Sequence, residues 1–387
     1  MAATSGSNVR RRARALAWLR RALEPRSAYL AGLLGGTLAA VGAKGAELPE
    51  DQAEAMYHLY DGGGVIAQGP AVLVRKSIAD TVSLSASSYV DMVSNASIDV
   101  VTQASKFKET RLEEGVGAQY AYRDSLLSLS TTRSHEPDYT ATGLNLDASQ
   151  DVFGGLTTVS LGYSRGWDTV LKHNDFNFSK AANHWQYRFG LTQILTPRWI
   201  ASANFEAVSD QGYLQSPYRA ARAFGAFVPE NDPSTRTSRA LTLRANGDVG
   251  GAGARSAVHA EYRYFWDTWN IKAHTLELGY SRYLGDRWLV DGYGRYYRQS
   301  HALFYSDDFT TQQTYMSRNR QLGTYNDEAL GTKASYSAWR VPGKYEVKLN
   351  GALELLRFNY QDYTDVRTGK LYSFSAAVME LFVSATF

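Results

Sequence analysis

The stretch "HTLELGYSRYL", His274–Leu284, sets Leu276, Leu278 and Tyr280 against Thr275, Glu277, Gly279 and Ser281. Successive side chains of a β-strand point to opposite faces, so this segment has one apolar and one polar face. It exceeds the about five or six residues of a typical soluble strand and suffices for the roughly 9 to 11 tilted residues that cross a bilayer. The stretch therefore predicts one strand of a transmembrane barrel.

The same alternation recurs along the chain, most clearly in "TVSLSASSYV" (Thr81–Val90) and "YEVKLNGALELL" (Tyr345–Leu356). Tight turns such as "YRDS", "LTPR" and "YLGDR" alternate with longer or more polar links such as "SNASIDVVTQASKFKE", "RSHEPDY" and "WDTVLKHNDFNFSKAANH". Outer-membrane barrels combine short periplasmic turns with long outer loops. The pattern predicts an all-β, up-and-down antiparallel barrel that spans the membrane.

About sixteen strands lie between these links. An even number is typical of bacterial barrels and places both chain ends on the periplasmic side. "DGGGVIAQGP" interrupts the first pair, so residues 54–62 form either a wall strand or a plug. A β-sandwich or a periplasmic solenoid is the soluble alternative, but no repeat of fixed period indicates a solenoid. The expected strands are 54–62, 66–78, 81–93, 109–123, 125–134, 138–151, 155–168, 183–195, 198–210, 236–248, 255–266, 270–284, 287–299, 324–339, 344–359 and 371–387.

The first 46 residues differ from the rest. The arginine-rich "NVRRRARALAWLRRALEPR" precedes the apolar run "AYLAGLLGGTLAAVGA" (Ala28–Ala43), an order typical of a secretory signal peptide cleaved around Ala43–Ala46. The alternative is an N-terminal membrane anchor, although the run is shorter than the ~20 residues of a spanning helix. We expect residues 1–46 to be a signal peptide and residues 47–387 to be a single barrel domain.

Composition supports a large β-structure. The 387 residues include 26 Tyr, 15 Phe, 8 Trp and 33 Gly, and aromatic residues suit strand surfaces. Cysteine is absent, which excludes a disulfide framework and a thiolate metal site. The leader carries eight Lys and Arg and one Glu, so its removal changes the formal net charge from +3 to about −4. The positive net charge, which was the main indication of a nucleic-acid partner, therefore belongs to the leader.

Several stretches are similar to an uncharacterised bacterial outer-membrane β-barrel family, catalogued as domain of unknown function 3570. They are "QGPAVLVRKSIADTVSLSASSYVDMVSNASIDVVTQAS", "DYTATGLNLDASQDVFGGLTTVSLGYSRGWD", "SDQGYLQSPYR", "EYRYFWDTWNIKAHTLELGY" and the aromatic C-terminus. The resemblance implies a barrel surrounded by outer-membrane lipid and supplies no activity or catalytic residue. The family is also associated with neighbours that resemble thioredoxin-like and flavin-transferase proteins. That association implies periplasmic redox partners, but no residue of this chain indicates such partners.

In each expected strand, the residues that alternate with the apolar ones face the lumen, and this alternation predicts which charged side chains line it. Both signs are mixed, and sixteen strands enclose room for a water-filled channel unless loops fill it. We therefore favour a channel or transport barrel for small polar solutes. For any single residue the alternative is an ion pair that merely satisfies a polar interior. The candidates are Arg188, Glu206, His259, Glu261, Arg263, Glu277, Asp291, Arg295, Lys333, Glu346, Lys348 and Glu354.

Two other function classes remain open. A non-transporting barrel would scaffold periplasmic or surface partners, with its lumen plugged by loops such as Asp210–Thr235. A barrel enzyme would use His259 with Glu261 and a lumen serine, but no nucleophile motif accompanies them, so we expect no catalytic residue. The seven histidines show no ligand spacing, so we expect no metal and no cofactor.

Aromatic residues cluster towards the expected strand ends, where they anchor barrels at the two membrane interfaces. Trp185, Trp199, Trp288, Trp339, Tyr120 and Tyr122 are the candidates for such girdles.

The C-terminal "ELFVSATF", Glu380–Phe387, places Leu381, Val383, Ala385 and Phe387 on the lipid face, with Phe382 as the inward exception. This pattern resembles the signal by which the barrel-assembly machinery recognises its clients. It predicts the cell outer membrane as the location, and that machinery with periplasmic chaperones as partners during biogenesis.

Overall fold

The computed structural model describes residues 46–95, 97, 107–173, 175–251 and 255–387. The expected signal peptide lies outside these residues except for Ala46. Within them the one helical element is the 3-10 turn η1 (Arg320–Leu322), and no helix there is long or apolar enough to cross a membrane.

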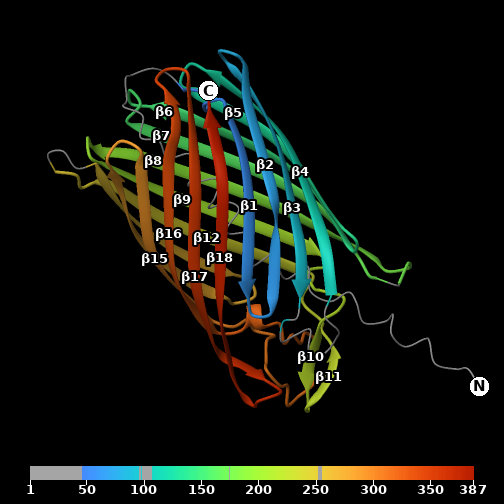
Figure 1. The fold of residues 1–387 in the computed structure, drawn as a ribbon. Coiled ribbons are helices and arrows are strands. Elements are labelled where there is room, and N and C mark those ends of the chain that lie inside the picture. The colour runs from blue at the N-terminus through green and yellow to red at the C-terminus, as the bar shows by residue number, and fades with distance from the viewer. Residues whose placement is uncertain (1–45, 96, 98–106, 174, 252–254) are drawn as a thin grey trace, which may run out of the picture.

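Sixteen antiparallel strands close into a barrel, which confirms the expected fold (Figure 1). Each expected strand is present, and residues 54–62 belong to the wall rather than to a plug. Two further strands, β10 (Ala220–Ala223) and β11 (Ala226–Pro229), form a separate hairpin. The wall strands are β1 (Gln52–Gly62), β2 (Val65–Ala79), β3 (Val82–Asn95), β4 (Phe107–Tyr122), β5 (Ser125–Glu136), β6 (Tyr139–Val152), β7 (Thr157–Leu171), β8 (Ser179–Thr196), β9 (Trp199–Gly212), β12 (Thr235–Asp248), β13 (Ser256–Asp267), β14 (Lys272–Leu284), β15 (Trp288–Gln299), β16 (Tyr325–Val341), β17 (Tyr345–Asp365) and β18 (Lys370–Thr386).

The barrel closes between its first and last strands. β1 pairs with β18 without interruption from Gln52 opposite Thr386 to Gly62 opposite Ala376. The seam therefore leaves no backbone edge exposed, and unpaired backbone groups in hydrocarbon would cost several kcal/mol each.

The two ends of the barrel differ. We call the end that holds Phe387 the turn end; every second connection, from β2–β3 and β4–β5 to β16–β17, also lies there. The opposite end is the loop end. The two longest connections, residues 212–235 and 299–325, lie at the loop end with β10 and β11 (Figure 1).

Connections at the loop end vary in length. The polar link "RSHEPDY" is short, because β5 ends at Glu136 and β6 begins at Tyr139. β1 and β2 meet through Gly63 and Gly64, whose φ angles of 59° and 81° are left-handed and suit residues without a Cβ. Neighbouring antiparallel strands need only a few residues to connect, so polarity alone did not indicate length.

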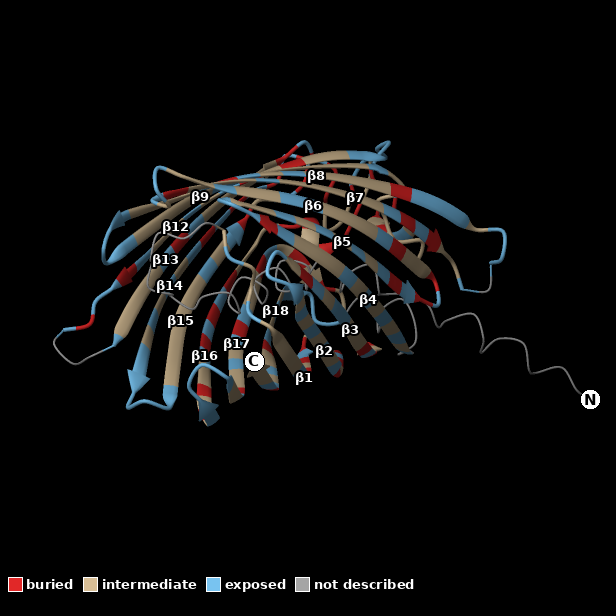
Figure 2. Cartoon of the chain, turned by 90° about the horizontal axis from the view of Figure 1, so that it is seen from above, coloured by how far each residue is buried: buried red, intermediate tan, exposed pale blue. Residues whose placement is uncertain are grey.

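The wall has an apolar outer face and a more polar inner face. Leu127, Leu129, Leu146, Leu161 and Phe189 point outward and are exposed, and the residues that alternate with them point inward. Figure 2 shows this alternation as short bands of exposed and partly buried residues along most strands. An apolar outer face is what a lipid-facing wall requires.

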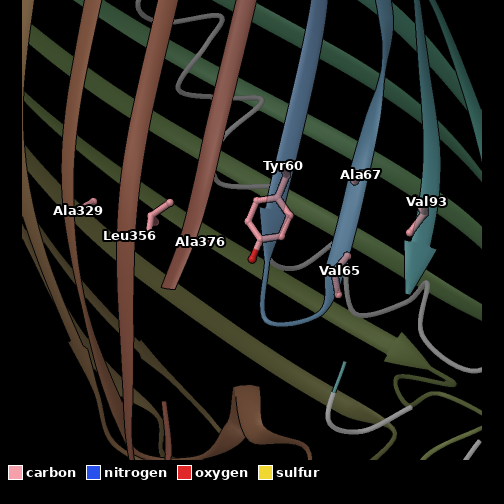
Figure 3. Close-up of a cluster of buried hydrophobic side chains, with 7 residues drawn as sticks. All are labelled: Tyr60, Val65, Ala67, Val93, Ala329, Leu356 and Ala376. Carbon is pink, nitrogen blue, oxygen red and sulfur yellow. The ribbon is translucent and has the colours of Figure 1, made fainter. Parts of the chain in front are cut away.

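Part of the inner face is apolar and lies on both sides of the closing seam. Figure 3 shows this cluster, which comes from β1–β3 and β16–β18 and is fully or almost fully buried. Its burial stabilises the six strands that meet at the seam. The cluster consists of Tyr60, Val65, Ala67, Val93, Ala329, Leu356 and Ala376.

Candidate functional site

The inner face is uneven around the barrel. From β3 to β9 many inward positions hold Gly, Ser, Thr or Asn, which project little into the lumen. We call this stretch of wall the small-residue side. Its register places the following residues inward: Ser85, Ser87, Gly115, Gly117, Ser128, Ser130, Gly143, Asn145, Ser149, Ser160, Gly162, Ser164, Gly166, Gly190 and Asn204.

The opposite stretch, from β15 to β18, is filled by rings. Phe358 stacks on Phe374 with ring centroids 4.6 Å apart, and Tyr325 lies 5.1 Å from Tyr360. The turn η1 folds in against these rings: Arg320 is fully buried, 5.5 Å from the ring centroids of Tyr372 and Phe374. We call this stretch the aromatic side, and its rings leave little room for solvent.

A polar recess of about 420 Å³ lies on the inner face from β5 to β13, so it extends past the small-residue side onto β12 and β13. Strand register arranges its inward side chains in two rows. One row runs Ser128, Asp147, Gly162, Arg188 and Glu206, and the next runs Ser149, Ser160, Gly190, Asn204, Thr242 and Arg263. Water reaches the recess, because the Asp147 side chain is 47% exposed although it faces inward.

The first row is held by a chain of polar contacts. Arg188 Nη2 lies 2.7 Å from Asp147 Oδ1, across the intervening β7. Arg188 Nη1 donates to Ser164 Oγ at 2.8 Å and to Gln186 Oε1 at 2.9 Å. Gln186 Nε2 in turn donates to Glu206 Oε2 at 2.8 Å. The three charged side chains of the row, Asp147, Arg188 and Glu206, are therefore linked along the recess wall.

Three of the twelve lumen candidates, Arg188, Glu206 and Arg263, line the recess. The others also lie on the inner face, but most pair within the wall. His259 Nε2 lies 3.2 Å from Glu277 Oε1, and Arg244 Nε lies 3.7 Å from Glu261 Oε2.

The candidates on β15–β17 form a second set of contacts. Arg295 Nη2 lies 3.0 Å from Asp327 Oδ1 and 3.7 Å from Glu354 Oε1. Lys348 Nζ lies 3.2 Å from Glu346 Oε2. The candidates Asp291 and Lys333 are opposite in register, and the Lys333 ammonium lies 5.2 Å from the centroid of the inward ring of Phe382.

Sequence reasoning missed several inward polar residues. Asp147 is one, although Leu144, Leu146 and Ala148 mark the outer face of β6 and place it inward by the same alternation. A buried set on β1, β3 and β4 is another. Asp91 Oδ1 lies 2.7 Å from His58 Nε2, and Asp91 Oδ2 lies 2.9 Å from Arg111 Nη2.

A third missed set lies towards the loop end. His184 Nδ1 lies 2.7 Å from Asp210 Oδ1, and His184 Nε2 lies 2.9 Å from Asp168 Oδ2. The imidazole of His184 therefore lies between two carboxyl groups, at hydrogen-bond distance from each. The three residues lie on the neighbouring strands β7, β8 and β9. Their positions in the sequence alone did not show that they meet.

The two longest loops pack on each other at the loop end, and we call residues 213–234 with 300–324 the cap. Ala223 bridges Phe309, and Asn231 bridges Met316. Arg318 N donates to Glu230 Oε1 at 2.8 Å. Full burial, with Asp232 nearby, raises the pKa of Glu230 to about 7.

The Arg318 guanidinium ties the cap to the wall. Its Nη2 lies 2.6 Å from Asp307 Oδ1 and donates to the Thr364 carbonyl at 2.6 Å. Its Nη1 donates to the Tyr363 hydroxyl at 3.1 Å, and the guanidinium lies 4.2 Å from the centre of that ring. The loop Asp210–Thr235, which would plug the lumen in the alternative of a non-transporting barrel, packs on residues 300–324 at the loop end.

The candidate girdle residues Tyr120, Tyr122, Trp199, Trp288 and Trp339 are exposed near the turn end. The sixth, Trp185, lies nearer the loop end, with the Arg165 guanidinium 3.7 Å from its ring centroid.

At the C-terminus, Leu381, Val383 and Phe387 are exposed on the outer face, where Ala385 lies beside them. Phe382 points inward and is buried.

The described residues do not assemble the catalytic set of His259, Glu261 and a serine. The hydrogen bond of His259 goes to Glu277 rather than to a serine, so His259 and Glu261 do not assemble with a nucleophile. Across the described ranges, no group of three or more His, Asp or Glu side chains is arranged to hold a metal ion.

Solved outer-membrane barrels resemble the chain. A bacterial polysaccharide outer membrane secretin aligns at a TM-score of 0.51 and 10% identity, over 88% of this chain and 100% of that one. The siderophore receptor PirA from Pseudomonas aeruginosa aligns at 0.42 and 8% identity, over 87% and 81%. A Pseudomonas aeruginosa FadL homologue aligns at 0.40 and 11% identity, over 88% and 90%. At this identity the secretin match establishes a shared fold and nothing more.

Comparison with curated proteins finds no match. The model of one family, described as "Protein of unknown function (DUF3570)", matches residues 101–350, which is more than half of the chain. This match agrees with the resemblance carried by "DYTATGLNLDASQDVFGGLTTVSLGYSRGWD" and "EYRYFWDTWNIKAHTLELGY". The chain therefore belongs to the DUF3570 family of outer-membrane-type β-barrels.

Proposed function

We propose that this protein is an outer-membrane passage for small polar solutes, and that the path follows the small-residue side of the lumen. One observation carries the proposal. Asp147 faces inward yet is 47% exposed, while inward residues elsewhere, such as Asp91 and Phe382, are almost fully buried. A barrel needs a water-filled path in order to conduct.

The orientation follows from general barrel architecture. Short turns of outer-membrane barrels face the periplasm and long loops face outward, so the turn end is the periplasmic end and the cap faces the medium. The outward residues Leu381, Val383, Ala385 and Phe387 are then the assembly signal read by the barrel-assembly machinery. Periplasmic chaperones deliver the chain, and outer-membrane lipid surrounds it.

Single-channel conductance of the purified barrel in planar bilayers tests the proposal. Adjacent residues on β9 supply matched variants, because Asn204 faces the recess and Ala203 faces outward. Asn204→Trp fills the recess and should lower the unit conductance, whereas Ala203→Trp should leave it unchanged. A silent wild-type barrel, or equal conductance in both variants, contradicts a path along this wall.

A second function is favoured by the cap. Its two loops bridge through Ala223 with Phe309 and Asn231 with Met316, an arrangement suited to a sealed barrel that scaffolds periplasmic or surface partners. Deleting the hairpin Ala220–Pro229 separates the two functions. If the intact barrel is silent and the deletion variant conducts, the cap seals the lumen and scaffolding is the better description.

A further inference from the structure

One charged side chain of the recess has no polar partner among the described residues. Arg188 is paired with Asp147, and Glu206 accepts from Gln186. Arg263 is different: across the residues that the structure describes it makes no ion pair and no hydrogen bond, and its close contact is the ring of Phe265, 5.5 Å away. A guanidinium left with free donors in a wetted recess attracts an anion.

Neutral hydrogen-bonding groups lie in line with Arg263. Register places Thr242 beside it on β12 and Asn204 beside Thr242 on β9. Ser160 and Asn204 both reach over Gly190, where an added Cβ would lie 2.3 Å from Ser160 Oγ and 2.7 Å from Asn204 Oδ1. Two strand spacings separate Asn204 from Arg263, about 10 Å. That distance matches a small molecule with a charged group at one end and hydroxyls along its length.

We propose that Arg263, with Thr242 and Asn204, forms a subsite for the oxyanion of a small hydroxylated solute, a carboxylate or a phosphate monoester. The guanidinium binds the two oxygens in a forked geometry, and the Thr242 hydroxyl and the Asn204 amide bind the hydroxyls. This inference rests on the proposed passage, of which it names the solute class. With this subsite, the recess would select among the solutes that pass through the pore.

Calorimetric titration of the folded barrel with gluconate tests the subsite, and sorbitol serves as the uncharged probe. We expect gluconate to bind more tightly than sorbitol. Arg263→Gln should weaken gluconate binding about tenfold, the loss typical of one charge-assisted contact, without changing sorbitol binding. Titration with glucose 6-phosphate decides between the two oxyanions, because the tighter of the two probes identifies the preferred group.

Arg75→Gln is the matched control. Arg75 also faces inward from β2, but it lies outside the recess, and the variant carries the same change in net charge. It should bind gluconate as the wild type does. Arg263→Lys keeps the charge without the forked donors and should recover part of the affinity, which covers the case in which Arg263→Gln does not fold.

The outcomes separate the subsite from the passage. Equal gluconate binding by wild type, Arg263→Gln and Arg75→Gln, or no preference of the wild type over sorbitol, overturns the subsite while a conducting barrel still stands. A barrel that is silent in bilayers but binds gluconate through Arg263 overturns the passage and retains the subsite.

Discussion

Arg188 on β8 reaches Asp147 on β6 across the whole width of β7, and the contact passes over the bare backbone of Gly162. A Cβ at position 162 would lie 2.5 Å from Asp147 Oδ1 and 2.6 Å from Arg188 Nε. Side chains on strands two apart can meet where the strand between them carries a small side chain or none at that level. The glycine is therefore a condition for the charge pair that lines the recess.

Gly162→Val should break this pair. The added atoms occupy the space of both charged groups, so the carboxylate and the guanidinium must turn into the recess, and we expect a lower unit conductance. The control is Gly292→Val, because Gly292 faces outward and a Cβ there would meet nothing closer than 4.0 Å. Conductance of the Gly162→Val barrel equal to that of the control would contradict this geometry.

Asp147→Asn should change ion selectivity with little change in stability. The side chains of Asp147 and Arg188 are 47% and 31% exposed, so water screens the pair and its loss should cost at most about 1 kcal/mol of unfolding free energy. The uncompensated Arg188 should shift the reversal potential in a salt gradient towards anion preference. An unchanged reversal potential would place Asp147 outside the conducting path.

Asp91→Ala, in contrast, should strongly lower the unfolding free energy of the barrel. Asp91 contacts both His58 and Arg111, and its side chain is only 3% exposed. Removing it leaves the largely buried guanidinium of Arg111 with only the more distant carboxylate of Glu113, 3.9 Å away, and breaking a buried pair typically costs about 3–5 kcal/mol. Urea unfolding in lipid vesicles measures this loss. A cost similar to that of Asp147→Asn would mean that water reaches the site, contrary to its burial.

The sequence predicted the wall of the barrel well, because side-chain alternation is a local property of each strand. Leu276, Leu278 and Tyr280 lie outward, and Glu277 lies inward, as the opening stretch predicted. The same rule placed Arg263 on the inner face. It could not show that Arg263 lies in a recess, since that depends on which residues the neighbouring strands place at the same level.

The cap and the asymmetry of the lumen were beyond local reasoning. The contact of Arg318 with Glu230 joins two loops that are separated in sequence by four wall strands, β12 to β15. The alternation of residues within a strand cannot predict such a contact. Gly162 and Gly190 were visible in the sequence only as glycines. Register on both sides shows that they leave space for Arg188, Ser160 and Asn204. Loop packing and cross-strand rows arise only after the barrel closes.

The cap should loosen as the pH rises through neutrality, because of Glu230. Its pKa is raised to about 7 by burial, against 4.5 when exposed, so the packed cap holds a proton that the opened cap releases. This contribution to cap stability is complete below pH 4.5 and is lost as the pH passes about 7. Arg219 opposes the shift, while Asp232 adds to it.

Hydrogen exchange of the segments 226–234 and 307–318 at pH 5 and pH 8, corrected for intrinsic rates, measures the effect. We expect weaker protection at pH 8 in the wild type. In Glu230→Gln the amide keeps an acceptor for the Arg318 N–H, so protection should no longer depend on pH. Asp308→Asn serves as control, because Asp308 is a cap carboxylate that lies 3.3 Å from Arg222 and is 35% exposed. Wild-type pH dependence in Glu230→Gln would assign the titration to another group of the cap.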